Sequence, residues 1–163
     1  MAIQRSDSAN IDLGTALNSM ASSTTACAAS DTVTSSTTSN LVGISARWFV
    51  GIGAITPTSS TVFNVFVWGT NDNTTRPGYQ GGSTEVIPAA AGAITLSANG
   101  VSAIRFLKSS LVHTASQTLS DEADVVAALG FIPKRWGLVF QNQTGAALAA
   151  SGHTAEYEET YYT

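Results

Sequence analysis

Few side chains in this chain have the chemistry of a catalytic group. His113 and His153 are the only histidines, and Ser and Asp are plentiful enough to complete a Ser-His-Asp arrangement on paper. Neither histidine lies near a Gly-x-Ser-x-Gly motif, which exposes the nucleophile of many hydrolases on a sharp turn. We therefore interpret both histidines as surface residues, and we expect a chain without catalytic residues that is not an enzyme.

Metal and cofactor sites have no clear motif either. The segment Asn71-Asp72-Asn73-Thr74 is only faintly similar to a calcium loop, because it lacks the spaced acids and the closing Glu of an EF-hand. Cys27 is the only cysteine, which excludes an internal disulfide and favours a role as a small apolar residue. Glycine-rich nucleotide-binding motifs are absent from the sequence. We expect no metal and no cofactor.

The composition favours contacts with protein. Charged residues make up 11% of the 163 residues, against roughly 25% in an ordinary soluble domain, and Ser and Thr fill the polar positions. Uncharged hydroxyls lose less free energy than ions when water is removed, so such a surface suits contact with neighbouring subunits. The net charge is −4 and the seven basic residues are scattered, which argues against a nucleic-acid partner.

The length is typical of one domain with one sizeable core. The first residues lack the apolar stretch of a secretory signal, and no run of 18 apolar residues follows. We therefore expect no membrane association and a protein made and kept in the cytoplasm.

The first forty residues differ from the rest of the chain. They contain no aromatic residue and carry two runs of Ser and Thr, so they cannot bury much apolar area by themselves. We predict an extended N-terminal arm over residues 1–40 and a β-sandwich domain over residues 41–163. Two interpretations of the arm remain open at this point, a segment laid along a neighbouring subunit and a frayed terminus. A short helix over residues 12–21 would be weakened by Gly14.

Hydrophobic residues alternate with a period of two from residue 41 onward, which predicts strands. The predicted core face of the first long strand is formed by Val42, Ile44, Ala46, Trp48, Val50 and Ile52. Further strands are predicted at residues 62–68, 84–87, 93–98, 101–108, 135–141 and 153–162, with Ile104 and Phe106 pointing inward and an Asn99-Gly100 hairpin turn. One short helix is predicted from a Ser120 cap to Gly130.

The strand at residues 62–68 is apolar on both faces, and this predicts assembly. In a two-layer sandwich each strand has only one face in the core. Leaving three large apolar side chains exposed would forgo roughly 1.5 to 3 kcal/mol each, so something covers them. The chain's own helix or arm is one candidate, and a symmetric neighbouring subunit is the one we favour. The predicted subunit interface consists of Arg47, Phe49, Phe63, Val65, Val67 and Glu159.

Glu159 belongs to this set because it lies between Tyr157 and Tyr161 on the more apolar face of the last predicted strand. An unpaired carboxylate there would cost several kcal/mol. We therefore predict an arginine partner for it, Arg47 or Arg135, from the same or another subunit.

The closing segments at residues 135–148 and 158–163 give the chain a resemblance to a known class. The chain resembles the capsid decoration, or cement, proteins of tailed bacteriophages. The resemblance covers the pattern of hairpins, loop and aromatic last strand over residues 40–163 and the Ser/Thr-rich arm before it. The resemblance implies a jelly-roll β-sandwich that forms homotrimers on the outer surface of the icosahedral capsid. It also implies bridging between capsomers, with the major capsid protein as partner, after assembly in the host cytoplasm.

A second hypothesis is a tail-tip or fibre module that binds host surface glycans. Residues 69–82 are rich in turn formers and are predicted to form a long exposed loop. Its candidate contact residues are Trp68, Arg76 and Tyr79.

Overall fold

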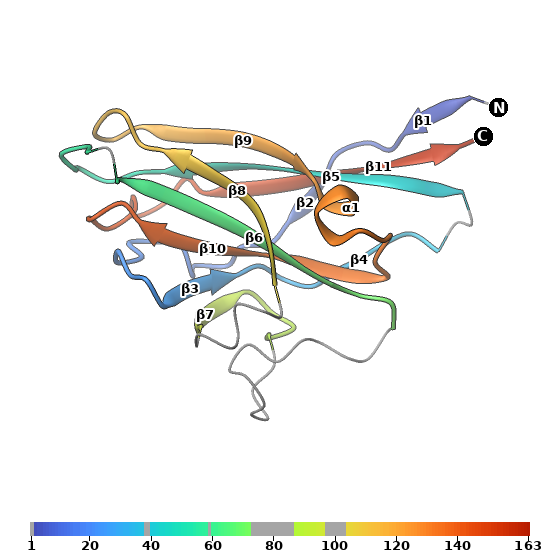
Figure 1. The fold of residues 1–163 in the computed structure, drawn as a ribbon, viewed down its shortest axis with the longest axis horizontal. Coiled ribbons are helices and arrows are strands. Elements are labelled where there is room, and N and C mark those ends of the chain that lie inside the picture. The colour runs from blue at the N-terminus through green and yellow to red at the C-terminus, as the bar shows by residue number, and fades with distance from the viewer. Residues whose placement is uncertain (1, 38–39, 59, 73–86, 97–103) are drawn as a thin grey trace.

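The computed structural model describes residues 2–37, 40–58, 60–72, 87–96 and 104–163, and in these ranges the chain is mainly β with two antiparallel sheets (Figure 1). The five-stranded sheet has the order β1-β11-β5-β9, and β2 pairs with β11 on the same side as β1. Its strands are β1 (Ile3–Arg5), β2 (Ala9–Ile11), β5 (Leu41–Gly51), β9 (Thr118–Asp124) and β11 (Thr154–Tyr162).

The six-stranded sheet has the order β7-β3-β10-β6-β8, and β4 pairs with β10 beyond the end of β3. Its strands are β3 (Ala26–Ala29), β4 (Val33–Thr34), β6 (Val62–Thr70), β7 (Gly92–Thr95), β8 (Arg105–Leu111) and β10 (Arg135–Gln143). Of the expected strand at residues 84–87, residues 84–86 lie outside the described residues, as does the Asn99-Gly100 turn.

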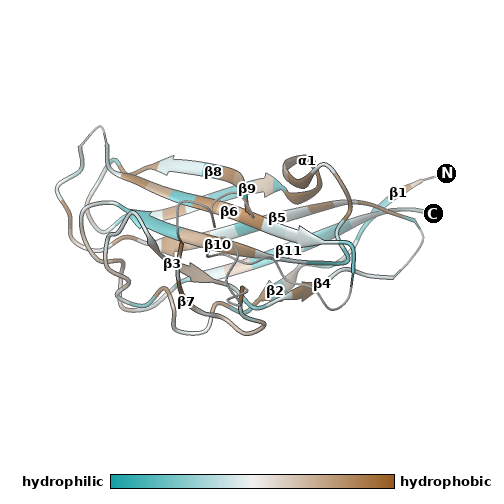
Figure 2. Ribbon diagram, turned by 60° about the horizontal axis from the view of Figure 1, so that its bottom comes forward, coloured by the Kyte–Doolittle hydropathy of each residue, from teal (hydrophilic) through white to brown (hydrophobic). Residues whose placement is uncertain are grey.

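The main core lies between the two sheets, as the period-two pattern predicts. Trp48 of β5 and Phe140 of β10 are fully buried there, and the brown inner stretches of β6 and β10 follow the same layer in Figure 2. Of the predicted core face of β5, only Val42 is not buried. A register shift between Thr160 and Tyr161 leaves Val42 unpaired with β11 and turns Leu41 inward in its place.

A second, smaller core covers the outer face of the six-stranded sheet. Trp68 and Val139 lie at its centre, each with 0% exposure. They are covered by side chains from β7 and its flanking segments: Ile87, Ile94, Leu96 and Ile104. Strand β6 is therefore covered on both faces, and the cover comes from its own chain. The favoured expectation that a neighbouring subunit supplies it is wrong for these residues.

The N-terminal residues are part of the sheets, so the predicted boundary at residue 40 is wrong. Strands β1 and β2 pair with β11, and β3 and β4 pair with β10. Leu13 and Leu17 reach the main core from a series of turns and not from the short helix considered for residues 12–21; Gly14 adopts a positive φ of 52° in these turns. The two ends of the chain meet, because Ala2 and Thr163 exchange backbone hydrogen bonds of 3.0 and 2.9 Å.

The one helix among the described residues, α1 (Val125–Leu129), begins later than predicted. Ser120 belongs to β9, and the cap is Asp124, whose carboxylate accepts a hydrogen bond of 2.9 Å from the Ala127 backbone N–H. Gly130 ends the helix with a φ of 79°, as the glycine in the sequence predicts.

Candidate interaction surface

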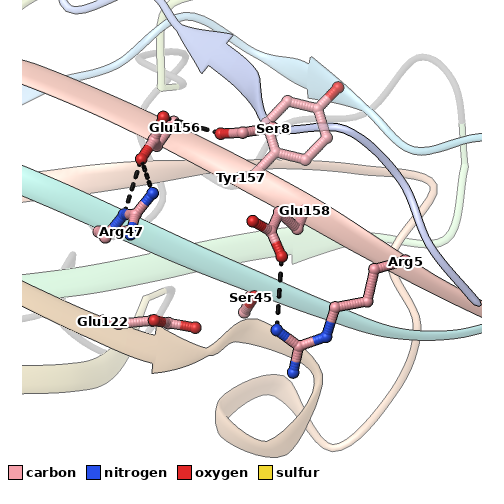
Figure 3. A pocket seen from close by; sticks show the side chains of 8 residues that line it. All are labelled: Arg5, Ser8, Ser45, Arg47, Glu122, Glu156, Tyr157 and Glu158. Atoms are coloured by element: carbon pink, nitrogen blue, oxygen red, sulfur yellow. Dashed lines mark hydrogen bonds and ion pairs between the residues drawn. The ribbon is translucent and has the colours of Figure 1, made fainter.

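The outer face of the five-stranded sheet carries a row of charged side chains (Figure 3). In the strand register, Arg47 on the central strand β5 lies opposite Glu156 of β11 on one side and Glu122 of β9 on the other. Cross-strand neighbours on one face are close enough for their side chains to interact. The pairing of the three strands therefore places one guanidinium between two carboxylates.

Glu156 has two partners on this face. The Arg47 Nε donates a hydrogen bond of 2.7 Å to the Glu156 carboxylate, and the hydroxyl of Ser8 donates one of 2.7 Å. The Ser8 hydrogen bond, followed by the Arg47 hydrogen bonds, lowers the pKa of Glu156 below its usual value. The charged form of this carboxylate is therefore the one that the surface stabilises.

A hollow of about 120 Å³ lies beside this pair, next to Ser45 and Glu122. Arg5 reaches into it from β1 and forms a long ion pair of 3.5 Å with Glu158. Among the described residues, no hydrogen bond or ion pair engages the Glu122 carboxylate. In a chain with 18 charged residues, five line this one hollow, and three of the five are acidic. Such a hollow is suited to accept a basic side chain from a partner protein.

Two residues of the predicted interface lie together on this surface. The guanidinium carbon of Arg47 lies 5.7 Å from the centre of the half-buried Phe49 ring, within the range of a cation–π interaction. This contact explains an aromatic residue on a strand face where a polar one was expected. We call the region around Arg47, Phe49, Glu122 and Glu156 the charged face.

Three other residues of the predicted interface do not lie on any surface. Phe63, Val65 and Val67 point from β6 into the main core, each with 0% exposure. Their assignment to a subunit interface is therefore wrong. The apolar residues left over on β6 are those of the opposite parity, and of these Trp68 is buried in the second core.

Glu159 is buried, as its position in the last strand predicts, but its predicted arginine partner is wrong. With 6% exposure, its carboxylate accepts a hydrogen bond of 2.9 Å from the Ser36 backbone N–H and a second from the Tyr161 hydroxyl. Arg47 is engaged by Glu156 on the opposite side of the sheet. Burial, followed by the Glu159 hydrogen bond, raises the pKa of Tyr161. Neutral donors therefore satisfy this carboxylate.

Of the predicted loop contacts, Trp68 is fully buried and cannot contact a ligand, and Arg76 and Tyr79 lie outside the described residues.

His113 is exposed, while His153 is half-buried and its ring Nε2 lies 2.9 Å from the Ala149 carbonyl oxygen. In the described ranges, the acidic, histidine and cysteine side chains form no group of three that could hold a metal ion. No helix among the described residues has the length and apolar character needed to cross a membrane.

Sequence reasoning missed one exposed aromatic pair. Phe106, expected to point inward, is 57% exposed on the outer face of the six-stranded sheet. Its ring lies edge-on to Phe66, with a distance of 5.7 Å between the ring centres. Ile104 has the same parity and is buried in the second core, so alternation alone does not reveal where that core ends.

Comparisons with protein-family models, with curated proteins and with solved structures found no match for this chain.

Proposed function

We propose that this protein is a structural component of a tailed-bacteriophage virion, a decoration protein that binds the outside of the capsid and bridges neighbouring capsomers. The proposed partners are further copies of the chain, in a homotrimer, and the major capsid protein. The protein has no enzymatic role in this proposal.

The order of the strands supports the proposal most. Eight of the eleven strands among the described residues, with the short β1, β4 and β7 set aside, carry this order: β2, β3, β5, β6, β8, β9, β10 and β11. Counted in chain order from one to eight, they read 1-8-3-6 in one sheet and 2-7-4-5 in the other. This order supports a jelly roll as the proposed architecture, one that viral capsid and lectin domains use. Because one fold serves many functions, the order supports the class and does not select the partner.

The charged face supports a protein partner. Arg47 and Phe49 remain as accessible members of the predicted subunit interface, and the hollow beside them offers the Glu122 carboxylate to a basic side chain. Arginine and aromatic residues are enriched where binding energy concentrates in protein interfaces. We propose that this face forms the contact between subunits of the trimer.

The direct experiment adds purified protein to capsids from which the decoration layer has been removed. We expect saturable binding at hundreds of copies per particle and greater heat resistance of the capsid. The variant Arg47→Glu, which reverses the central charge, should reduce assembly and binding, while Phe106→Ser on the opposite face should bind as the unchanged protein does. If the unchanged protein does not bind, the decoration proposal is wrong.

A second candidate function, binding of host glycans at the tail tip, is favoured by one observation. The Phe66–Phe106 pair presents the exposed ring of Phe106, and aromatic rings are common platforms for sugars. In this case Phe106→Ser should abolish binding to host cells, and the protein should be present in only a handful of copies per particle. The two variants therefore separate the two functions.

A further inference from the structure

Strand β1 forms one edge of the five-stranded sheet, and among the described residues its one paired neighbour is β11. Ala2 and Thr163 exchange hydrogen bonds with each other, whereas the Tyr162 N–H turns the other way and donates to the Asn40 carbonyl oxygen at 3.0 Å. Because bonded and non-bonded pairs alternate along an antiparallel ladder, the backbone N–H and C=O groups of Ile3 and Arg5 point away from β11. They form an open row of donors and acceptors at the sheet edge.

Strand β1 has two of the features that protect an edge strand, its length of three residues and the charge of Arg5, but others are missing. The strand contains neither proline nor lysine, and its apolar residue Ile3 is 68% exposed, the highest value among the large exposed hydrophobic residues of the described chain. Its cross-strand neighbour Tyr162 is 40% exposed. In Figure 1, β1 and the end of β11 project together from one end of the sandwich, so a second strand can approach the open side.

We infer that two copies of this chain pair through their β1 strands, antiparallel and centred on Gln4. In this register, Ile3 lies opposite Arg5 of the partner subunit, and each such pair exchanges two backbone hydrogen bonds. The outward N–H and C=O groups of Ile3 and Arg5 on one β1 strand then face their acceptors and donors on the other, without a shift of either strand along its axis. The two five-stranded sheets become one continuous sheet across a two-fold axis.

The side chains of β1 suit a second copy better than an unrelated strand. Gln4 would lie on the two-fold axis beside its own copy, where a neutral amide can both donate and accept a hydrogen bond, and a charged side chain would repel itself. Ile3 would pack on the aliphatic stem of Arg5 of the partner subunit, on the face where Arg5 already reaches Glu158. The inference stands on this edge alone and does not depend on the proposed function.

A disulfide at the two-fold axis tests the register. In a pair without backbone hydrogen bonds, opposed Cα atoms lie about 4.5 Å apart, within the range for a disulfide. The variant Gln4→Cys should therefore form a covalent dimer under mild oxidation. In the matched variant Ile3→Cys, the more exposed position, the two cysteines would lie roughly 8 Å apart and should not cross-link. Burial raises the pKa of Cys27 to about 12, so the native thiol does not compete.

Equal cross-linking of both variants would indicate random collision and would overturn the inference, as would no cross-linking of Gln4→Cys.

A second measurement uses Ile3→Pro, which removes an outward N–H without removing a hydrogen bond to β11. Sedimentation over a range of concentrations should show association through this edge weakened about tenfold or more. Leu111→Ser, which removes a different exposed apolar side chain, should leave this association unchanged. If both tests fail, pairing through β1 is wrong, but the capsid-binding experiment keeps its expected result, so each proposal can be rejected without the other.

Discussion

Trp68 and Gly137 lie directly opposite each other in the ladder between β6 and β10, and the indole ring occupies the space that a side chain at residue 137 would need. A Cβ atom at residue 137 would lie 2.7 Å from the Trp68 Nε1 and 3.2 Å from the Ser30 hydroxyl oxygen. The second core can close over the six-stranded sheet because this one residue has no side chain.

Gly137→Ala should therefore lower the free energy of unfolding by about 1 to 3 kcal/mol, since the ring and the strand cannot both keep their places. Urea denaturation measures the change. Gly43→Ala is the matched control on β5, because its Cβ would meet Thr160 at an ordinary 3.5 Å. Equal losses for the two variants would contradict this account of Trp68 and Gly137.

The two aromatic residues on the outer face of the six-stranded sheet should differ in their effect on stability. Trp68→Ala should cost about 3 to 5 kcal/mol, because it opens a cavity in the second core. Phe106→Ala should cost about 1 kcal/mol or less, because it loses mainly the contact with Phe66. Thermal unfolding of the two variants checks this, and a large loss for Phe106→Ala would show that this ring is structural.

The cap of α1 can be tested without disturbing its packing. Asp124→Ala removes the acceptor of the Ala127 N–H and should cost about 1 kcal/mol. Asp124→Asn keeps an acceptor oxygen and should retain most of the stability. If the two variants lose the same amount, the charge of Asp124 and not its hydrogen bond stabilises the helix.

Glu156 should make the charged face sensitive to acid. Its pKa is lower in the folded chain than the usual 4.5, so its contribution to stability is present above that pH and is lost as the pH falls through the folded value. Glu156→Gln should therefore weaken the fall in stability below about pH 4.5, measured by urea denaturation at several pH values. Ser8→Ala, which removes the largest cause of the shift, should change the profile in the same direction. An acid profile unaltered in both variants would contradict the role of this pair.

The long strands could be predicted from the sequence because one physical rule places them. In β5, apolar residues at every second position must face a core, and from Ile44 to Val50 the structure has them inward. The expectation for the first forty residues failed because β1 to β4 pair with β10 and β11 through backbone hydrogen bonds, which leave little trace in composition. The Ser and Thr runs that dominate this part of the chain also draw attention away from the buried Leu13 and Leu17, which precede them.

The candidate surface was predictable only in part. Phe49 and Arg47 stood out on the polar side of a strand, and both lie on the charged face. Their partner Glu156 was not predictable, because the register between β5 and β11 decides which side chains meet. The surplus of apolar residues on β6 does indicate a need for cover, but the cover comes from β7 and its flanking segments and not from the favoured neighbouring subunit.

The reciprocal bonds between Ala2 and Thr163 have a consequence for engineering. A short linker joining the two ends would close the polypeptide into a ring without stretching it, and a new opening at the exposed Ser151 and Gly152 would give a circular permutant. Cargo fused at either end of this chain would emerge from the same end of the sandwich, on the side where β1 lies. A bulky fusion there should act as a steric shield for that strand.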